Sequence, residues 1–351
     1  MSEGKRMIRG YATMDGTANY LKRKGIGDIG LRKNEYFYSS AIGLGNHLGD
    51  FSQEHSDAYI SAMRYALENG INVLDTAINY RGMKSEKDTG KVIRELIEVN
   101  HQLTREELVV STKAGLLFGD ITEGLRPEVY LEQRLIPRGV DRSKFQELSD
   151  GPLHTLNVDF FQHAIEVSRS NLGLETIDIH YIHIPEISRY LLGEEEFYRQ
   201  LVNLFKFYED LVRKEEIRFY GMALEMMVLE EENENWHISL NKVCEIANSV
   251  AGEEHHFRFL QLPLNLSCHS AITIKNQEID SCSYTLVDAA NLLGIEVVTN
   301  MPFGMGECFR QWTMEELLSY LLYNNSIQGS ICGSKRVEHV KDYIELMKLK
   351  L

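Results

Sequence analysis

The sequence predicts a (β/α)8 barrel, preceded by a short N-terminal hairpin and interrupted by a long loop after the third strand. Short apolar segments alternate along the chain with segments of helical periodicity, which is the pattern of parallel βαβ units. Eight such units follow one another, and this number predicts a closed barrel. An open doubly wound sheet is disfavoured, because AIGLGNHLG at Ala41–Gly49 only loosely imitates the glycine fingerprint of that fold.

The composition supports a globular protein with enough apolar residues for a large core. The chain has 351 residues, of which 43% are hydrophobic and 25% charged. An α/β barrel of this length is normally one domain, so a single domain is expected over residues 1–351. The formal net charge of −15 argues against a nucleic-acid partner.

Two further patterns concern the compartment. The N-terminus MSEGKRMIRG lacks the apolar region of a secretory signal, and no apolar run is long enough to cross a bilayer. Five scattered cysteines without a CxxC pair indicate reduced thiols rather than a disulfide framework. We therefore expect a cytoplasmic protein that does not bind membranes.

The elements follow in order along the chain. Residues 1–35 are weakly periodic with glycine turn points, which favours a small hairpin ahead of the barrel, and Ser40–Gly43 begins the first strand. Each further strand is a short apolar run, and each helix repeats apolar residues at helical spacing, as Phe161, Ala164 and Ile165 do. The other predicted strands are 72–75, 108–113, 177–183, 219–223, 259–262, 296–300 and 328–332. The predicted helices are 56–69, 85–100, 160–172, 197–214, 238–250, 283–293, 313–324 and 336–349.

One stretch departs from this alternation. Between Lys113 and Phe160 the sequence is rich in charged and turn residues and has no convincing periodicity. Loops of this length are uncommon in compact domains and are usually functional or disordered. Because the stretch follows a strand end, we expect Gly119–His154 to lie over the barrel mouth and shape a substrate pocket. The alternative is a mobile surface insertion.

The segment Asn72–Gly90 combines a strand end, a tight loop and a helix start. Asp75 ends the strand, and Tyr80 lies in the loop that follows. Ser85 is the predicted N-cap of the next helix, and Glu86 places a carboxylate in its first turn. This layout directs an acid and a phenol towards the same end of the barrel.

Two more ionisable residues stand at predicted strand ends. Lys113 ends ELVVSTK, and His183 ends IDIHYIH. Each residue alone has an ordinary structural explanation as a cap, a solvated lysine or a core histidine. On a barrel, however, the carboxyl ends of the strands form one face, so Asp75, Tyr80, Lys113 and His183 are expected to meet there as a catalytic group.

The residue types predict their roles. Tyr80 would protonate an oxygen that develops negative charge, and Lys113 and His183 would stabilise that charge. A nearby ammonium is expected to lower the pKa of Tyr80, and Asp75 would keep Lys113 charged and in place. This chemistry suits reduction of a carbonyl by hydride, which a cofactor must supply.

The sequence resembles the aldo-keto reductase family at these residues. The similarity lies in segments such as ALENGINVLDTAINYRGMKSEKDTGKVI, ELVVSTKAG, SRSNLGLETIDIHYIHIPE and SIQGSICGSK, in family order from about Ala41 to Lys335. The family's catalytic tetrad of Asp, Tyr, Lys and His falls on the four residues above. The resemblance implies a (β/α)8 barrel, NADPH as cofactor, and reduction of an aldehyde or ketone to an alcohol.

The resemblance also implies a cofactor site, with departures. Ala223 and Leu224 stand where the family has the Ser and Asn that hold the nicotinamide carboxamide, and Asn300 stands where many members have a stacking aromatic. Lys335 and Arg336 resemble the region that binds the adenosine phosphate. The implied cofactor-binding residues are Gln261, Asn300, Pro302, Phe303, Gly304, Gly333, Ser334, Lys335, Arg336 and His339.

Other functions remain open at this point. The altered nicotinamide site also allows a non-redox reaction that uses the same acid–base residues, or a non-catalytic binding subunit. A Schiff base at Lys113 is disfavoured because Asp75 favours the ammonium. No metal site is expected, since His180 and His183 point to opposite faces of a strand. The expected partner is a small carbonyl compound, and the sequence does not indicate an oligomeric state.

Overall fold

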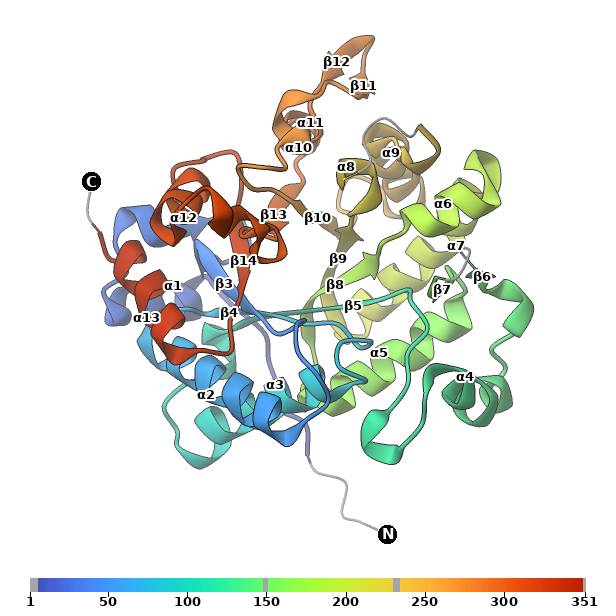
Figure 1. Cartoon of the computed structure of the whole chain (residues 1–351). Coiled ribbons are helices and arrows are strands. Elements are labelled where there is room, and N and C mark those ends of the chain that lie inside the picture. The colour runs from blue at the N-terminus through green and yellow to red at the C-terminus, as the bar shows by residue number, and fades with distance from the viewer. Residues whose placement is uncertain (1–5, 148–150, 230–233, 350–351) are drawn as a thin grey trace.

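The computed structural model describes residues 6–147, 151–229 and 234–349. Its centre is a closed barrel of eight parallel strands (Figure 1). The last strand pairs with the first through Ser330 and Ile42, which closes the ring. The barrel strands are β3 (Ile42–Gly45), β4 (Val73–Asp75), β5 (Val109–Ala114), β8 (Ile177–His183), β9 (Ile217–Ala223), β10 (Phe257–Pro263), β13 (Glu296–Asn300) and β14 (Gly329–Gly333). The predicted fold class is therefore confirmed.

Helices surround the barrel and connect successive strands (Figure 1). All eight predicted helices are present, with ends shifted by a few residues. They are α2 (Gln53–Asn69), α3 (Lys84–Arg94), α5 (Val158–Leu172), α7 (Glu194–Arg213), α9 (Leu240–Ala251), α11 (Leu286–Leu292), α12 (Met314–Leu322) and α13 (Val337–Met347). Shorter helices α6 (Glu186–Leu192), α8 (Met226–Leu229) and α10 (Ser270–Thr273) lie in the connections. Within the described ranges, no helix is long and apolar enough to cross a membrane.

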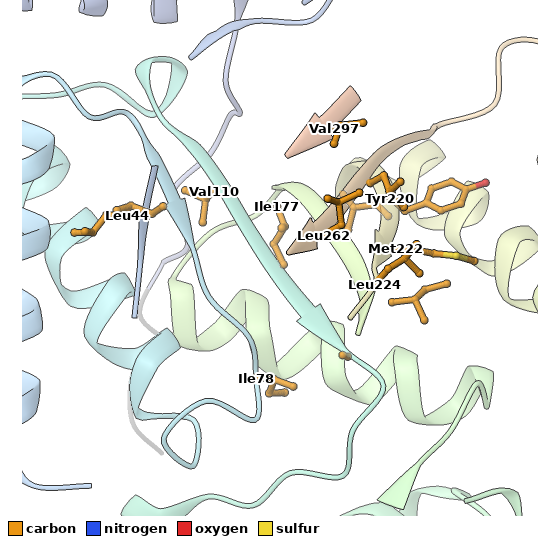
Figure 2. Packing of buried hydrophobic residues seen from close by; sticks show 14 of the residues in the cluster. Leu44, Ile78, Val110, Ile177, Tyr220, Met222, Leu224, Leu262 and Val297 are labelled. Atoms are coloured by element: carbon orange, nitrogen blue, oxygen red, sulfur yellow. The ribbon is translucent and has the colours of Figure 1, made fainter. Parts of the chain in front are cut away.

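The strands pack apolar side chains on both of their faces. Val110 belongs to the large core between strands and helices, while its neighbour Val109 belongs to the cluster inside the barrel. Phe219 and Tyr220 alternate in the same way. Figure 2 shows the outer core, to which Leu44, Val110, Ile177, Tyr220, Met222, Leu262 and Val297 contribute from six strands. Burial on both faces explains why these strands are continuous apolar runs in the sequence.

The amino end of the barrel is filled by the chain's own N-terminal segment. Ala12 and Phe37 are buried with the inward-facing residues of the strands, and the Phe37 ring stacks on Phe259 with centroids 5.9 Å apart. The predicted hairpin exists, but it spans β1 (Leu31–Lys33) and β2 (Tyr38–Ser40), later than expected. It follows helix α1 (Met14–Lys24), which the sequence analysis missed. This end is plugged, so the site must be sought at the carboxyl end.

The start of α3 differs from the prediction. The helix begins at Lys84, one residue before the predicted N-cap Ser85. Its start is set by the preceding loop, in which Arg81, Gly82 and Met83 all have positive φ. The Ser85 hydroxyl instead donates to the Asn46 carbonyl at 2.8 Å and ties the helix to the end of β3. Glu86 lies in the first turn, as predicted.

Candidate active site

A cavity of about 790 Å³ opens at the carboxyl ends of the barrel strands. This volume lies within the usual range for small-molecule and cofactor sites. Asp75, Tyr80 and His183 line it, and Lys113 contacts Asp75 from the adjacent strand. The structure therefore brings the four predicted catalytic residues together on one face of the barrel.

Asp75 and Lys113 form a buried ion pair at the floor of the cavity. Lys113 Nζ donates to Asp75 Oδ2 and, at 2.9 Å, to the Thr76 carbonyl. The other carboxylate oxygen, Oδ1, accepts from Ser111 Oγ at 2.6 Å and from Gln261 Nε2 at 3.0 Å. Burial lowers the pKa of Lys113, and the Asp75 carboxylate opposes this effect. The bonds to Oδ1 fix the carboxylate, which in turn fixes the direction of the ammonium.

Tyr80 lies close to Lys113 and His183. Lys113 Nζ lies 5.2 Å from the centroid of its ring, and the His183 ring meets it edge-on with centroids 5.6 Å apart. The predicted lowering of its pKa is wrong. Burial, together with the charges of Asp75 and Glu225, raises the pKa of Tyr80 well above its ordinary value. The charge of Lys113 does not prevent this because Asp75 compensates it.

His183 is neutral and is held through its backbone. Burial, reinforced by the charge of Lys113, lowers the pKa of its imidazole well below the ordinary range. Its Nδ1 is buried and has no hydrogen-bond partner among the described residues. His154 Nε2 lies 2.8 Å from the His183 carbonyl, and His154 Nδ1 lies 2.7 Å from Ser188 Oγ. The end of β8 is thus fastened to the segment that precedes α5.

The loop that carries Tyr80 is locked by the side chain of Arg81. Arg81 is 4% exposed and pairs with Asp88 Oδ2 at 2.8 Å. Its other guanidinium nitrogens donate to Ser56 Oγ and to the Asp50 carbonyl, both at 2.9 Å. In the left-handed conformation of Gly82, a Cβ atom would come within 2.8 Å of Ile121. The position of Tyr80 therefore depends on its neighbours in the loop as well as on β4.

Two residues near the tetrad were missed by the sequence analysis. His47 follows β3, lines the cavity, and packs on Tyr80 with ring centroids 4.4 Å apart. Glu225 follows β9 and lines the cavity close enough for its charge to affect the pKa of Tyr80. Both residues lie within two residues of the strand ends at Gly45 and Ala223, and this position was the available signal.

The predicted cofactor-binding residues divide into two groups. Gln261, Asn300, Pro302, Phe303, Gly304, Gly333 and His339 line the cavity. Ser334, Lys335 and Arg336 lie outside its lining, in the turn that starts α13. Lys335 Nζ lies 2.7 Å from His55 Nε2, and Ser334 Oγ accepts from the Arg336 backbone at 3.1 Å. These three residues form a basic turn beside the cavity.

Two linked amide hydrogen bonds lie near Ala223 and Leu224, where the resemblance implies an altered nicotinamide site. Ala223 and Leu224 line the cavity without side-chain donors or acceptors. Asn300 Nδ2 donates to Gln261 Oε1 at 3.2 Å, and Gln261 donates onward to Asp75. Asn300 Oδ1 is buried and has no partner within the described ranges. The cavity thus retains an acceptor that is free for an amide N–H of a ligand.

The long segment after β5 does not take the predicted position. None of its described residues between Gly119 and His154 lines the cavity. The segment contains α4 (Pro127–Tyr130) and a π-helical turn at Leu131–Leu135, and it buries Leu131 and Leu135. Tyr130 Oη lies 2.9 Å from His163 Nε2 on α5. Packing therefore places the segment after β5 beside α5, as the lower right of Figure 1 shows. The segment reaches the site through His154, which lies 2.8 Å from the His183 carbonyl.

Within the described parts of the chain, no group of three or more His, Cys, Asp or Glu side chains could hold a metal ion. The site contains one ion pair, a phenol, neutral imidazoles, amides and the carboxylate of Glu225. Such a set can donate and accept protons and can stabilise charge on an oxygen atom.

Comparisons with known proteins give a match to one family model and to two curated relatives. Residues 41–231 match the model of the aldo/keto reductase family. The chain is 25% identical over 185 residues to the aldo-keto reductase AFTS1 of Alternaria alternata, across 50% of this chain and 44% of that protein. It is 33% identical over 150 residues to a D-threo-aldose 1-dehydrogenase of a Pseudomonas species, across 42% and 39%. The matches thus span less than half of either relative.

Solved structures share the fold over nearly the whole chain. An aldo/keto reductase from Klebsiella pneumoniae, in complex with NADP and acetate, has a TM-score of 0.56 at 17% identity, over 93% of this chain and 91% of that one. The glycerol dehydrogenase AKR11B4 from Gluconobacter oxydans has a TM-score of 0.60 at 15% identity, over 92% of both chains. These likenesses extend the barrel assignment beyond the matched residues 41–231.

Proposed function

Because the chain belongs to the aldo-keto reductase family, we propose that it is an NADP(H)-dependent oxidoreductase that interconverts an aldehyde or ketone and an alcohol. The observation that carries this proposal is the meeting of Asp75, Tyr80, Lys113 and His183 at one cavity. The relatives named as a reductase and as dehydrogenases support the same reaction class.

Residues of the cavity fit one end of the cofactor, and the basic turn beside the cavity fits the other. The unpartnered Asn300 Oδ1 can accept from the carboxamide in place of the missing Ser and Asn, beside Gln261. Lys335 and Arg336, at the N-terminus of α13, suit the adenosine phosphate. When bound, NADPH supplies the hydride that reaches the carbonyl carbon.

The protein's own residues handle the proton. Tyr80 is the donor to the carbonyl oxygen, since its raised pKa keeps the phenol protonated at neutral pH. Neutral His183 orients that oxygen through a ring N–H. After transfer, Lys113 stabilises the phenolate, and Asp75 holds Lys113 in place. In the oxidation direction the same groups act in reverse.

We infer the cytoplasm as the compartment of this enzyme. The five cysteines are all free, as expected for a reducing environment. Alkylation of the protein in freshly lysed cells should therefore modify the exposed Cys282 without prior reduction.

Cofactor binding tests the proposal. Titration with NADPH and NADH, followed by quenching of intrinsic fluorescence, should give tighter binding of NADPH because only it carries the 2′-phosphate. Lys335→Met combined with Arg336→Met should abolish that preference and leave NADH binding nearly unchanged. If the wild-type protein binds neither nucleotide, the redox proposal fails, and the non-redox and binding-subunit alternatives take its place.

A further inference from the structure

The charges that line the cavity do not balance. Three carboxylates line it among the described residues: Asp75, Glu225 and Glu307. Asp75 pairs with Lys113, and Glu307 pairs with Arg310 at 2.6 Å on the exposed rim. Glu225 is partly buried, and no described side chain forms an ion pair or hydrogen bond with its carboxylate. Among the described residues that line the cavity, the Glu225 carboxylate is therefore the one without a compensating cation.

A buried carboxylate holds the backbone of Glu225 in place. Its backbone N–H donates to Glu186 Oε1 at 2.6 Å, and Glu186 is fully buried at the start of α6. Burial also raises the pKa of Glu225 itself, so its ionised form is costly in the empty cavity. The carboxylate thus stands near the proton donor on an anchored backbone and lacks a cation.

Apolar residues form much of the wall of the cavity that holds Glu225. Leu48 and Leu229 line the cavity and remain 47% and 46% exposed, while Leu224 and Ile184 add further apolar surface. Pockets of this kind bind the hydrocarbon part of a ligand through burial and orient it through a few polar groups. A ligand that fits this cavity should therefore combine an apolar body with a positively charged group that faces Glu225.

We propose that Glu225 recognises a protonated amine on the substrate, so that the preferred substrates are apolar or aromatic aldehydes and ketones that carry a basic nitrogen. This inference rests on the proposed function of the site. An ammonium beside the carboxylate restores the lost ionic interaction in a partly desolvated pocket, where it is stronger than in water. The oxidised nicotinamide ring is the other cation that could lie there, and the experiment separates the two.

The test compares two benzaldehydes of the same shape. One is 4-(dimethylaminomethyl)benzaldehyde, which is cationic at neutral pH, and the other is its neutral analogue 4-isobutylbenzaldehyde. The wild-type protein should prefer the amine in kcat/KM, and Glu225→Gln should lower the ratio of the two values at least tenfold, mainly through KM. The ratio cancels any effect of Glu225 on the pKa of Tyr80. In the matched control Glu307→Gln the ratio should stay within twofold, because that carboxylate is paired and exposed.

Two binding measurements make the outcome independent of turnover. In saturation-transfer NMR, N,N-dimethylbenzylamine should bind the wild-type protein better than Glu225→Gln, even if no aldehyde is reduced and the proposed function fails. An unchanged ratio of kcat/KM, or equal amine binding by both proteins, would overturn the proposal. So would a Glu225→Gln protein that keeps its amine preference but binds NADP+ more weakly relative to NADPH, since the nicotinamide would then be the cation.

Discussion

Tyr80 is surrounded by groups that hold its proton rather than remove it. Asp75 and Glu225 are negative, Lys113 is already paired, and His183 is neutral. A donor with a raised pKa is protonated throughout the neutral range. Reduction should therefore be nearly independent of pH from about 6 to 9, while oxidation, which needs the phenolate, should accelerate about tenfold per pH unit over the same range and should not level off at the ordinary phenol pKa of about 10.

Tyr80→Phe tests this role directly. The change removes the hydroxyl and keeps the ring that packs on His47 and His183, so the fold should persist. Carbonyl reduction should fall by about two to four orders of magnitude, the usual scale for loss of a general acid. Lys113→Met should cost a similar factor, and the double variant little more than either. The measurement is single-turnover reduction at saturating NADPH, and wild-type turnover in Tyr80→Phe would refute the mechanism.

The sequence was sufficient to place Tyr80 but not to predict its pKa. Its position follows from a local pattern, an apolar strand that ends at Asp75 and a loop in which Tyr80 lies five positions later. The sign of the pKa shift depends on burial and on Glu225, which is 145 residues away in the chain and comes close only through barrel closure. The same holds for His47, whose contact with Tyr80 joins the loops after two different strands.

At the scale of elements, the loops after the strands are held by buried polar side chains. Glu186, at the start of α6, accepts backbone N–H groups of Glu225 and, at 3.5 Å, of Met227, and so joins α6 to the loop after β9. Its second oxygen, Oε2, has no partner in the described structure. Burial is the main cause that raises the pKa of Glu186 to about 7.

This carboxyl predicts a pH dependence of stability. Its folded pKa lies above the unfolded value, so its contribution is fully present below about pH 4.5 and is lost as the pH rises through about 7. Glu186→Gln keeps an oxygen for the two N–H groups and cannot ionise. Between pH 5 and 8.5 the wild type should lose about 2.5 kcal/mol more unfolding free energy than the variant. Urea denaturation at both pH values measures this difference, and parallel pH profiles for the two proteins would contradict it.

Helices and strands could be predicted from sequence where their buried apolar residues recur at a regular spacing. The barrel strands and their helices are regular in this sense, and all were located. Helix α1 was missed although Thr13 caps it and Gly25 ends it, because its buried residues are few, chiefly Thr17, Tyr20 and Leu21. The segment after β5 was misplaced because its packing on α5 depends on contacts such as Tyr130 with His163, which no local pattern reveals.

At the scale of the whole molecule, the two ends of the barrel have different tasks. The amino end is closed by Phe37, which is 2% exposed and packs inside the strands. Phe37→Ala should lower the unfolding free energy by about 3–5 kcal/mol, as expected for an aromatic residue lost from a core. Thermal unfolding measures the loss. NADPH affinity at a temperature where the variant is folded should remain within twofold, and a larger change would mean that the two ends are coupled.

The plugged amino end has a consequence for how this protein could change over evolutionary time. Residues that stabilise the fold lie mostly away from the cavity. Substitutions at the open carboxyl end should therefore change ligand preference more than stability. The exchanges at Ala223, Leu224 and Asn300 lie at that end. A lineage with this architecture can explore new ligands by altering strand-end loops while the barrel beneath them persists, and the shared fold at 15–17% identity to solved structures is what such a history would leave.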